Sequence, residues 1–470
     1  MTRRTKLVCT IGPATADRLD ELVEAGMDVA RINFSHGTPG SWAAAADAVR
    51  AAGNGSGRSI AILTDLSGPK IRLGELATDT VELETGQPFV LRAGDADDRP
   101  GDRSAAAVSY AGLAGDVRVG DPVFLADGAA QLEVVAIDGD DVRTSVVRGG
   151  IVRARAGVAI PSERLTAPAL TDKDRADIPR AIELGADLLA QSFVRGPDDV
   201  RELRALVGSD GPSIVAKIET RPAVDAFDGI LEVADAVMIA RGDLGVEVPY
   251  EQVPILQKQL IRRALDRGIP TIVATQMLES MTASPRPTRA EASDVANAVF
   301  DGADAIMLSG ETAIGAFPIL AAEAAARIAS RCEQDGADYL ADGMALPPGT
   351  ITGSLAYAAV ALTRTDSSIA AIGCYTRTGR TARILSSLRP HVPILAFSPD
   401  PDVVNRLALA HGVVARRSDA LDPDADRLER LGGLVDMAGV APGAMVVLVS
   451  SSASPGSGPT RIGIHRAASA

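Results

Sequence analysis

The chain has 470 residues, of which 46% are hydrophobic and 23% charged, a composition typical of a globular protein with about two to four domains. Its 47 lysines and arginines against 61 aspartates and glutamates give a net charge of −14, which excludes the basic surface that nucleic-acid binding needs. It has no apolar run of about 18 residues and no secretory leader pattern, and its cysteines (Cys9, Cys332 and Cys374) are odd in number and widely spaced. We therefore expect a cytoplasmic enzyme that contacts no membrane and has neither disulfides nor a zinc site.

Eight short apolar runs rich in β-branched residues, each followed by a helix-like segment, recur along the chain. The runs are Lys6–Gly12, Asp28–Asn33, Ser59–Leu66, Asp187–Val194, Ser213–Glu219, Ala236–Asp243, Thr271–Gln276 and Ala305–Glu311. Continuous apolar strands that alternate with amphipathic helices indicate a parallel sheet buried on both faces. Eight such units favour a closed barrel, so we predict an α/β fold built on a (β/α)8 TIM barrel over residues 1–72 and 158–335.

About 120 residues separate the third run from the fourth, far more than one helix requires. Gly-Asp and Asp-Gly pairs there punctuate short alternating runs, which are Val81–Leu83, Phe89–Leu91, Val123–Leu125, Gln131–Ile137 and Val142–Val147. Such runs between turn pairs predict hairpins, so residues 73–157 are expected to form a small all-β domain inserted at the mouth of the barrel. An insert at that place is suited to act as a lid over an active site.

A third α/β region follows the barrel. Residues 335–350 are rich in Gly, Pro and Asp and are interpreted as a linker. The elements expected beyond it are the helices Ile351–Leu362, Gly379–Ser387 and Asp402–Ala410, the strands Ile369–Cys374, Ile394–Phe397 and Met445–Val449, and a final loop at Ser450–Gly458. Residues 350–470 are therefore predicted to form a C-terminal α/β domain.

Polar or charged residues end nearly every predicted barrel strand. They are Asn33, Ser35, Asp65, Ser192, Lys217, Glu219, Asp243, Thr275 and Glu311. Because the working residues of a (β/α)8 barrel lie at the carboxyl ends of its strands, we expect these side chains to meet at one rim. For Ser35, Ser192 and Glu311, a role as an ordinary loop residue or helix cap is equally open. Lys217 and Glu219 differ, because a buried strand rejects both charges and their spacing of two places them on one face.

The charged residues of this rim indicate a site for a metal and an anion. Glu219 and Asp243 follow neighbouring strands and could share a hard cation such as Mg2+. Glycines on both sides of Asp243 leave backbone amides free to meet an anion. The cations expected nearby are Arg31, Lys70, Arg72 and Lys217, and all five lysines of the chain lie in the barrel sequence. Phosphoryl transfer needs such a grouping, and no Walker or kinase glycine-rich loop is present. The residues alone predict a metal-assisted enzyme that acts on a small phosphorylated or carboxylated anion.

Seven longer motifs carry a family resemblance. They are Arg4–Pro13, Ala25–Gly37, Ile214–Glu219, Ile239–Glu247, Ala274–Met281, Pro287–Glu291 and Met307–Ala313. Together and in this order they resemble the pyruvate kinases. The resemblance covers the whole barrel with high specificity, the insert loosely and the C-terminal region in part.

The resemblance implies phosphoryl transfer from phosphoenolpyruvate to ADP, the last step of glycolysis, with Mg2+ or Mn2+ as the cofactor. Lys217, Arg31 and Thr275 would be the catalytic residues. Substrate would be bound by Arg31, Lys217, Gly242, Asp243 and Thr275, and the metal by Glu219 and Asp243. The proton donor to enolpyruvate stays open between a water relay near Thr275 and one near Lys217.

The resemblance also places the nucleotide, which would be bound by Asn33, Phe34, Ser35, His36 and Arg72. The lysine that the family usually carries before Gly157 is Ala156 here, and Arg155 or Arg153 could make that contact instead. Trp42 could stack on the adenine, although packing in a helix is the favoured interpretation. Members of the family are commonly homotetramers, and we expect the same here.

One departure from the family concerns a monovalent cation. Potassium-requiring members resemble Asp-Thr-Lys-Gly-Pro-Glu where this chain has Asp-Leu-Ser-Gly-Pro-Lys at 65–70. Leu66 removes a hydroxyl ligand, and Lys70 brings an ammonium that can replace the charge of K+. The resemblance places the cation region at Asn33, Ser35 and Asp65. We therefore expect an activity that does not require K+, the alternative being that Lys70 is a surface cation.

A second candidate binding site lies in the C-terminal domain. Its residues are Thr376, Arg377, Thr378, Gly379, Arg380 and Thr381. They resemble the family's effector loop and could cradle the phosphate of a phosphorylated effector. A capped helix with solvated arginines explains the pattern equally well. The closing segment 456–461 departs from the family's usual ending, so the effector cannot be identified.

Two other functions compete with a pyruvate kinase. A metal-dependent lyase or aldolase could use a related barrel for pyruvate-like substrates, although Lys217, Arg31 and Asp65 argue against it. A catalytically silent relative could bind metabolites as a regulator. The full set of Lys217, Glu219, Asp243 and Thr275 argues against that alternative.

Overall fold

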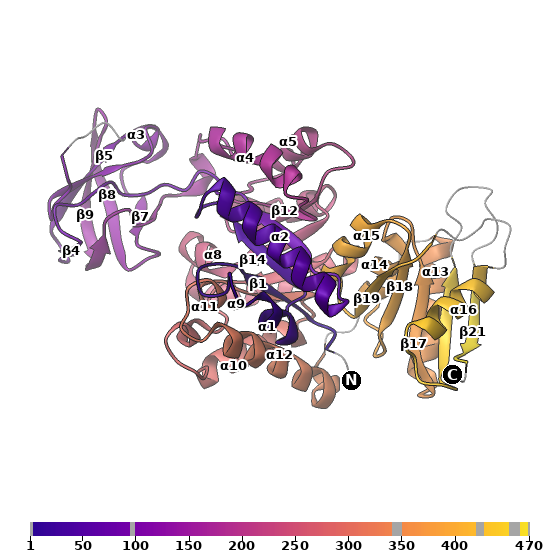
Figure 1. The fold of residues 1–470 in the computed structure, drawn as a ribbon. Coiled ribbons are helices and arrows are strands. Elements are labelled where there is room, and N and C mark those ends of the chain that lie inside the picture. The colour runs from indigo at the N-terminus through magenta and orange to yellow at the C-terminus, as the bar shows by residue number, and fades with distance from the viewer. Residues whose placement is uncertain (1–2, 95–98, 341–349, 420–426, 451–460, 469–470) are drawn as a thin grey trace.

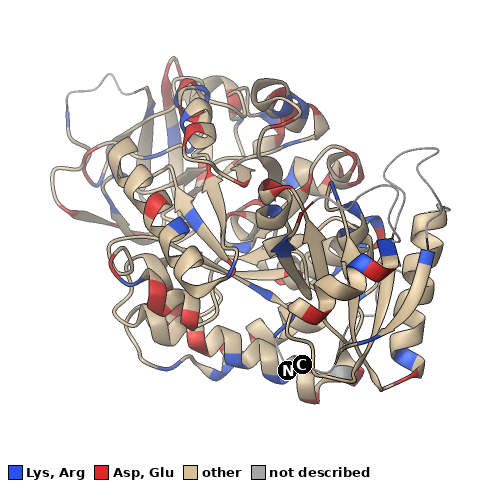
Figure 2. Ribbon diagram, turned by 45° about the vertical axis from the view of Figure 1, so that its right-hand side comes forward, with Lys and Arg blue, Asp and Glu red and all other residues tan. Residues whose placement is uncertain are grey.

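The computed structural model describes residues 3–94, 99–340, 350–419, 427–450 and 461–468. A barrel occupies the middle of the molecule, with an all-β domain on one side and an α/β domain on the other (Figure 1). Acidic and basic positions are interspersed over the helices rather than separated into faces of one sign (Figure 2). None of the described helices is long and apolar enough to cross a membrane.

The eight predicted barrel strands are confirmed. They are β1 (Lys6–Thr10), β2 (Val29–Asn33), β3 (Ala61–Asp65), β12 (Leu188–Gln191), β13 (Ser213–Ile218), β14 (Ala236–Ala240), β15 (Thr271–Ala274) and β16 (Ala305–Leu308). All neighbours are parallel, and the barrel closes in the order β1-β16-β15-β14-β13-β12-β3-β2. Nearly every strand residue is buried, since one face packs inside the barrel and the other against the helices.

Helices cover the outside of the barrel. They are α1 (Leu19–Glu24), α2 (Pro39–Ser56), α4 (Asp172–Glu183), α5 (Pro197–Val207), α6 (Arg221–Asp225), α7 (Phe227–Leu231), α8 (Arg241–Glu247), α9 (Val253–Arg267), α10 (Arg289–Phe300), α11 (Gly310–Ala313) and α12 (Pro318–Asp335). Short 3-10 helices lie at Ser162–Arg164, Tyr250–Gln252, Glu279–Thr282 and Ala337–Tyr339. At the start of α4, Thr171 and Asp174 form a reciprocal capping box.

The insert is all-β apart from α3 (Leu113–Asp116). Its strands are β4 (Thr80–Leu83), β5 (Pro88–Ala93), β6 (Ala105–Val108), β7 (Pro122–Leu125), β8 (Ala130–Asp138), β9 (Asp141–Arg148), β10 (Gly150–Arg153) and β11 (Val158–Ala159). Six of them form a sheet in the order β11-β7-β8-β9-β5-β6, and β4 pairs with β10. All five predicted runs form strands, whereas β6, β10 and β11 were not expected.

The C-terminal domain has a five-stranded sheet in the order β19-β18-β17-β20-β21. Its elements are α13 (Ile351–Thr365), β17 (Ile369–Tyr375), α14 (Arg380–Ser387), β18 (Ile394–Ser398), α15 (Pro401–Arg406), a 3-10 turn (Leu407–Leu409), β19 (Val413–Arg417), α16 (Arg427–Met437), β20 (Met445–Ser450) and β21 (Arg461–Arg466). The predicted helices and strands are all present, and β19, α16 and β21 are additional. Ser450 ends β20, and the rest of the predicted final loop lies outside the described residues, as does most of the predicted linker.

Buried polar contacts join this domain to the amino ends of the barrel strands. The guanidinium of Arg389 makes two bonds to Asp304, which precedes β16, at 2.9 and 3.1 Å. The ammonium of Lys6, at the start of β1, donates to the carbonyl of Val413 at 2.7 Å. The C-terminal domain thus lies at the opposite end of the barrel from the strand ends that carry the predicted site.

Candidate active site

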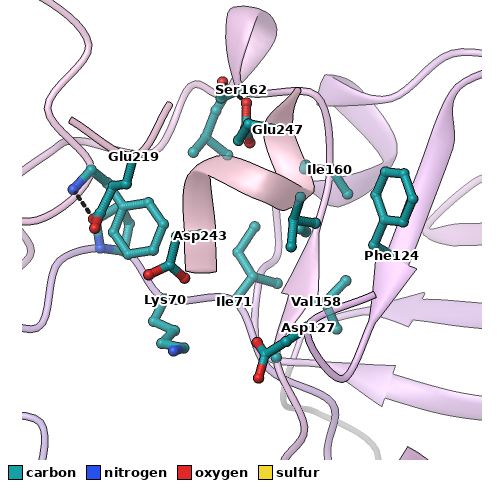
Figure 3. A pocket seen from close by; sticks show the side chains of 16 residues that line it. Lys70, Ile71, Phe124, Asp127, Val158, Ile160, Ser162, Glu219, Asp243 and Glu247 are labelled. Carbon is teal, nitrogen blue, oxygen red and sulfur yellow. Dashed lines mark hydrogen bonds between the residues drawn. The ribbon is translucent and has the colours of Figure 1, made fainter. Parts of the chain in front are cut away.

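A cleft lies between the carboxyl ends of the barrel strands and the all-β insert (Figure 3). Glu219 and Asp243 line it from the barrel side, and Phe124 and Asp127 line it from the insert. Lys70 lies at the connection between the two domains and lines the same cleft. The structure therefore brings the insert to the rim at which the predicted site residues end their strands.

Lys217 and Glu219 lie at the end of β13 and point to the same side, as their spacing predicts. The Nζ atom of Lys217 is 3.4 Å from Oε2 of Glu219 and 3.5 Å from Oδ1 of Asp65. Its shortest contact is a hydrogen bond of 2.7 Å to Oγ of Ser192. Side-chain exposures are 12% for Lys217 and 1% for each of the two carboxylates, so these charges interact with little solvent between them.

The pKa values of this group follow from burial and from the surrounding charges. Burial acts to lower the pKa of Lys217, but the carboxylates of Asp65, Glu219 and Asp243 outweigh it and raise that pKa. Burial raises the pKa of Glu219 to about 7, against the opposing effect of Lys217. The pKa of Asp65 is lowered, because Lys217 and Arg31 outweigh its burial. Lys217 is therefore a buried amine that remains protonated.

The carboxylates of Glu219 and Asp243 suit a divalent cation. Oε1 of Glu219 accepts the amide of Phe193 at 2.6 Å, whereas its Oε2 is buried without a hydrogen-bond partner. Both side chains lie toward the same part of the cleft in Figure 3. The described residues contain no group of three or more His, Cys, Asp or Glu side chains that could hold a metal. Two carboxylates with one unpartnered oxygen fit Mg2+ or Mn2+, which are commonly held by one or two carboxylates together with substrate oxygens and water.

Arg31 lies within β2 rather than beyond its end, and its guanidinium is directed at the next strand. Its Nε and Nη2 atoms contact Oδ2 of Asp65 at 2.8 and 2.7 Å, and its Nη1 donates to the hydroxyl of Thr10 at 3.0 Å. Asp65 therefore joins Arg31 to Lys217 through its two oxygens. Two buried cations therefore share this one carboxylate.

Thr275 and Gly242 meet across the ends of β14 and β15. Both strands are shorter than predicted, because Arg241 begins α8 and Thr275 adopts a left-handed backbone with φ of 69°. The amide of Gly242 donates to the hydroxyl of Thr275 at 2.7 Å, and that hydroxyl donates to the carbonyl of Ala274 at 2.6 Å. The predicted carboxylate-binding groups are therefore adjacent.

Comparison with known proteins agrees with this geometry. A family model described as pyruvate kinase, barrel domain, matches residues 2–322, and a second, described as pyruvate kinase, alpha/beta domain, matches residues 354–461. The chain belongs to the pyruvate kinase family. The pyruvate kinase of Mycobacterium tuberculosis strain H37Rv is 42% identical over 477 residues, which cover 99% of each chain. That of Mycobacterium intracellulare is 45% identical over 418 residues, covering 88% of this chain and 87% of the relative. That of Geobacillus stearothermophilus is 42% identical over 438 residues, covering 91% and 74%.

Membership of the pyruvate kinases makes this chain a phosphotransferase and gives the remaining predicted residues a context. The carboxamide oxygen of Asn33 accepts the amide of Ser35 at 3.0 Å, and Ser35 bonds to the hydroxyl of Ser67 at 3.2 Å. The pKa of His36 is lowered, first by loss of solvent around part of its ring and then by Arg72, Arg31 and Lys70. These cations therefore gather around the turn that follows β2.

Phe34 does not present its ring to this turn. The ring is 1% exposed and stacks on Trp42 at a centroid distance of 4.2 Å, while the indole of Trp42 donates to the carbonyl of His36 at 2.7 Å. The buried ring of Phe34 leaves its backbone as the part of this residue that faces the turn, and its contact with a nucleotide stays a prediction. Trp42 packs in the core with α2, as favoured from the sequence.

Lys173 is a candidate site residue to which the sequence gave no role. Its ammonium donates to the carbonyl of Phe34 at 2.8 Å, and it also contacts Ser67 and Asp177 at 3.4 and 2.6 Å. It lies in the first turn of α4, far in sequence from the residues of the turn after β2 that it contacts. The scarcity of lysine was the one signal that could have indicated it, because five lysines against 42 arginines make each ammonium unusual.

The lid side of the site contains Arg72. Its backbone forms an antiparallel β-bridge with Gly157, directly before β11, and its guanidinium donates to the carbonyl of Arg155 at 3.3 Å. Arg155 itself pairs with Glu75, and Ala156 is buried in the core of the insert. Of the two guanidiniums offered by the sequence as a replacement for the missing lysine, that of Arg155 is thus paired with a carboxylate in this structure, and the contact of Arg153 stays a prediction. Lys70 is exposed beside the cleft.

The remaining candidates divide between structural and peripheral positions. Glu311 is fully buried and accepts the amides of Leu278 and Ser309 at 3.0 and 2.7 Å, so it holds loops together. The segment 376–381 runs from the end of β17 into the first turn of α14 in the C-terminal domain, at the far end of the barrel from the cleft. Arg377 and Arg380 are exposed there, in agreement with either sequence interpretation.

Proposed function

We propose that this pyruvate kinase family member transfers the phosphoryl group of phosphoenolpyruvate to ADP, giving pyruvate and ATP. The observation that carries the proposal is the buried, protonated Lys217, whose Nζ lies 3.4 Å from Oε2 of Glu219, an oxygen that accepts no hydrogen bond. Phosphoryl transfer is catalysed mainly by positioning and by fixed positive charge around the group in flight. An ammonium held beside the carboxylates of Glu219 and Asp65 at a barrel mouth supplies both.

The residues around Lys217 divide the work of binding the substrate. Lys217 stabilises negative charge on the transferring phosphoryl group, and Arg31 adds a second cation from its pair with Asp65. On substrate binding, the hydroxyl of Thr275 and the amide of Gly242 would exchange the bonds that they make here, to the carbonyl of Ala274 and to Thr275, for bonds to the substrate carboxylate. Together with the amide of Asp243 they would place the phosphoryl-bearing end of the substrate beside Lys217.

Glu219 and Asp243 hold Mg2+ or Mn2+ in this proposal. The bound cation would neutralise charge on the carboxyl and phosphoryl oxygens of the substrate. The unpartnered Oε2 of Glu219 and the position of both carboxylates at the cleft support the assignment.

The nucleotide lies on the side of Asn33, Ser35, His36, Arg72 and the backbone of Phe34 in this proposal, with Lys173 as an additional phosphate ligand. The division into a barrel (1–72 and 158–335), a lid (73–157) and a C-terminal regulatory or oligomerisation domain (350–470) is part of it. A lid that closes over the cleft would exclude water, which otherwise competes with ADP for the phosphoryl group.

Independence from K+ is a further part of the proposal. Lys70 lines the same cleft as Glu219 and Asp243, and Leu66 is buried with no oxygen in its side chain to bind a cation. A tethered ammonium at this place supplies the charge that a bound K+ would bring.

The family resemblance also supports a homotetramer in the cytoplasm, with a phosphorylated effector bound at 376–381. All three cysteines are free and buried, which suits a reducing compartment. Light scattering of the purified protein tests the tetramer directly.

The reaction is tested by following pyruvate and ATP together, with phosphoenolpyruvate, ADP and Mg2+ each omitted in turn. We expect equal amounts of both products and no reaction when any component is missing. Pyruvate without ADP would instead indicate a lyase, and binding of phosphoenolpyruvate without any product would indicate a silent relative.

A further inference from the structure

Ser192 makes the shortest contact of the Lys217 ammonium. Its Oγ atom is 2.7 Å from Nζ, whereas the two carboxylates lie at 3.4 and 3.5 Å. Ser192 is only 3% exposed, at the turn after β12. The sequence left its role open between a loop residue and a working residue, and the reaction as proposed does not use it.

The hydroxyl of Ser192 has a defined direction. It donates its single proton to the carbonyl of Leu66 at 2.7 Å, at the end of β3, and its contact with Oδ1 of Asp65 is longer, at 3.4 Å. Because the proton is used in the shorter bond, a lone pair of Oγ is left to accept from Lys217. Ser192 thus links the ends of β3 and β13 through one oxygen atom.

The backbone next to Ser192 is held by Glu219, which also pairs with Lys217. The amide of the next residue, Phe193, donates to Oε1 of Glu219 at 2.6 Å, in a left-handed conformation with φ of 54°. The turn at Ser192 and Phe193 packs closely against Gly68. Only glycine fits there, because a Cβ atom at Gly68 would lie 2.7 Å from the Phe193 ring and 2.9 Å from Cβ of Ser192. Consecutive residues of one turn therefore hold the lysine and the carboxylate.

We propose that Ser192 is a positioning residue that keeps the ammonium of Lys217 away from the carboxylates of Glu219 and Asp65. The hydroxyl holds Nζ at a distance from both, so that Oε2 of Glu219 stays available to a divalent cation and two N–H groups of Lys217 stay available to a phosphoryl group. This inference rests on the metal site of the proposed function.

Removal of the hydroxyl has a specific consequence. In Ser192→Ala, the ammonium loses its nearest acceptor, and its next acceptors are the carboxylates less than 4 Å away. A tight pair between Lys217 and Glu219 then competes with the cation. Loss of a residue that orients a metal ligand typically weakens metal binding by about 10–100-fold, and we expect a value in this range.

The test is direct binding of Mn2+ in the absence of substrates, measured from the electron paramagnetic resonance signal of the free ion. Wild type, Ser192→Ala, Lys217→Met and the double variant form a cycle. We expect Ser192→Ala to weaken binding at least about tenfold in the wild-type background and by less than about twofold in the Lys217→Met background. Ser386→Ala is the matched control, since this serine is also buried and bonds a carbonyl at 2.8 Å in the C-terminal domain.

Two outcomes would overturn the proposal. One is a Ser192→Ala protein that binds Mn2+ within about twofold of wild type, and the other is equal weakening in both backgrounds, which is what general damage to the turn would produce. Because the cycle measures binding without turnover, it can succeed even if no phosphoryl transfer occurs. The failure of the proposed reaction and the failure of this inference are thereby distinguishable.

Discussion

The guanidinium of Arg241 donates to the carbonyl oxygen of Thr275 at 2.7 Å, across the ends of β14 and β15. The same group donates to Asp294 at 2.7 Å and reaches the carbonyl of Gln276 at 3.4 Å. Thr275 and Gln276 both have positive φ values, 69° and 55°. A β-branched residue such as Thr275 with a positive φ costs on the order of 1–3 kcal/mol, so the backbone of this turn is strained. Arg241 holds the turn in the conformation that places the hydroxyl of Thr275 against the amide of Gly242.

Replacement of Arg241 is therefore expected to damage catalysis more than folding. In Arg241→Met, Thr275 is released toward an extended backbone and its hydroxyl moves away from Gly242. A displacement of about 1 Å at such a group can lower kcat by about 100-fold. Steady-state kinetics check this, with Arg327→Met as the control, because Arg327 is exposed and pairs only with Glu323 on its own helix. An unchanged kcat in Arg241→Met would show that the turn keeps its conformation without the clamp.

The barrel was predictable because each strand is a continuous apolar run that ends in a polar residue. Strands without such a signal were missed. β6 is built from Ala105–Val108, where three alanines have little strand preference, and β21 pairs antiparallel at an edge with polar residues among its apolar ones. The local sequence does not reveal such strands, because they are stabilised by the neighbouring strands with which they pair.

The site divides in the same way. Lys217 and Glu219 were predictable, because a charged side chain in a buried strand is costly unless it is paired or binds a ligand. Lys173 was not, since its contact with Phe34 joins residues 139 positions apart and appears only once the barrel has closed. The burial of the Phe34 ring could not be predicted either, because its neighbours Asn33, Ser35 and His36 are polar and at least partly exposed.

The pair between Arg389 and Asp304 is expected to stabilise the junction of the barrel and the C-terminal domain. Both side chains are less than 10% exposed, so Asp304→Ala leaves a buried, unpaired guanidinium. We expect a loss of about 3–5 kcal/mol in the free energy of unfolding, measured by urea titration. Glu323→Gln, which breaks an exposed pair, should cost less than about 1 kcal/mol. Equal effects of the two variants would contradict the assignment.

His411 predicts a dependence of stability on pH. Burial and then Arg389, Arg4 and Lys6 hold its pKa well below 6.5 in the folded protein. Because this pKa is lowered on folding, the unfolded chain binds the proton more readily than the folded protein. The contribution of neutral His411 to the free energy of unfolding is therefore complete above about pH 6.5 and is lost as the pH falls below that value. The slope from this group is at most about 1.4 kcal/mol per pH unit.

Urea titrations of wild type and His411→Asn at pH 7.5, 6.5 and 5.5 measure that slope. The variant should lose less stability than wild type between pH 6.5 and 5.5, whatever its stability at pH 7.5. Parallel curves for the two proteins would show that other groups account for the acid sensitivity.

Lys70 predicts the response to monovalent cations. The wild-type rate should be unchanged when tetramethylammonium replaces K+, whereas Lys70→Met should be slower and should recover in part on addition of K+. Lys258→Met is the control, because that lysine is exposed and pairs with Asp301 away from the cleft. A wild-type enzyme that K+ stimulates strongly would show that Lys70 is only a surface cation.

The most direct test of the account is the amount of ATP formed in a single turnover by wild type and by Lys217→Met, with enzyme in excess over phosphoenolpyruvate and with saturating ADP and Mg2+. The rate constant should fall by at least about 100-fold in the variant, because a preorganised charge of this kind is worth at least that factor. Binding of Mn2+ should persist, since Glu219 and Asp243 are unchanged. A variant that forms ATP within tenfold of the wild-type rate would contradict the role assigned to Lys217.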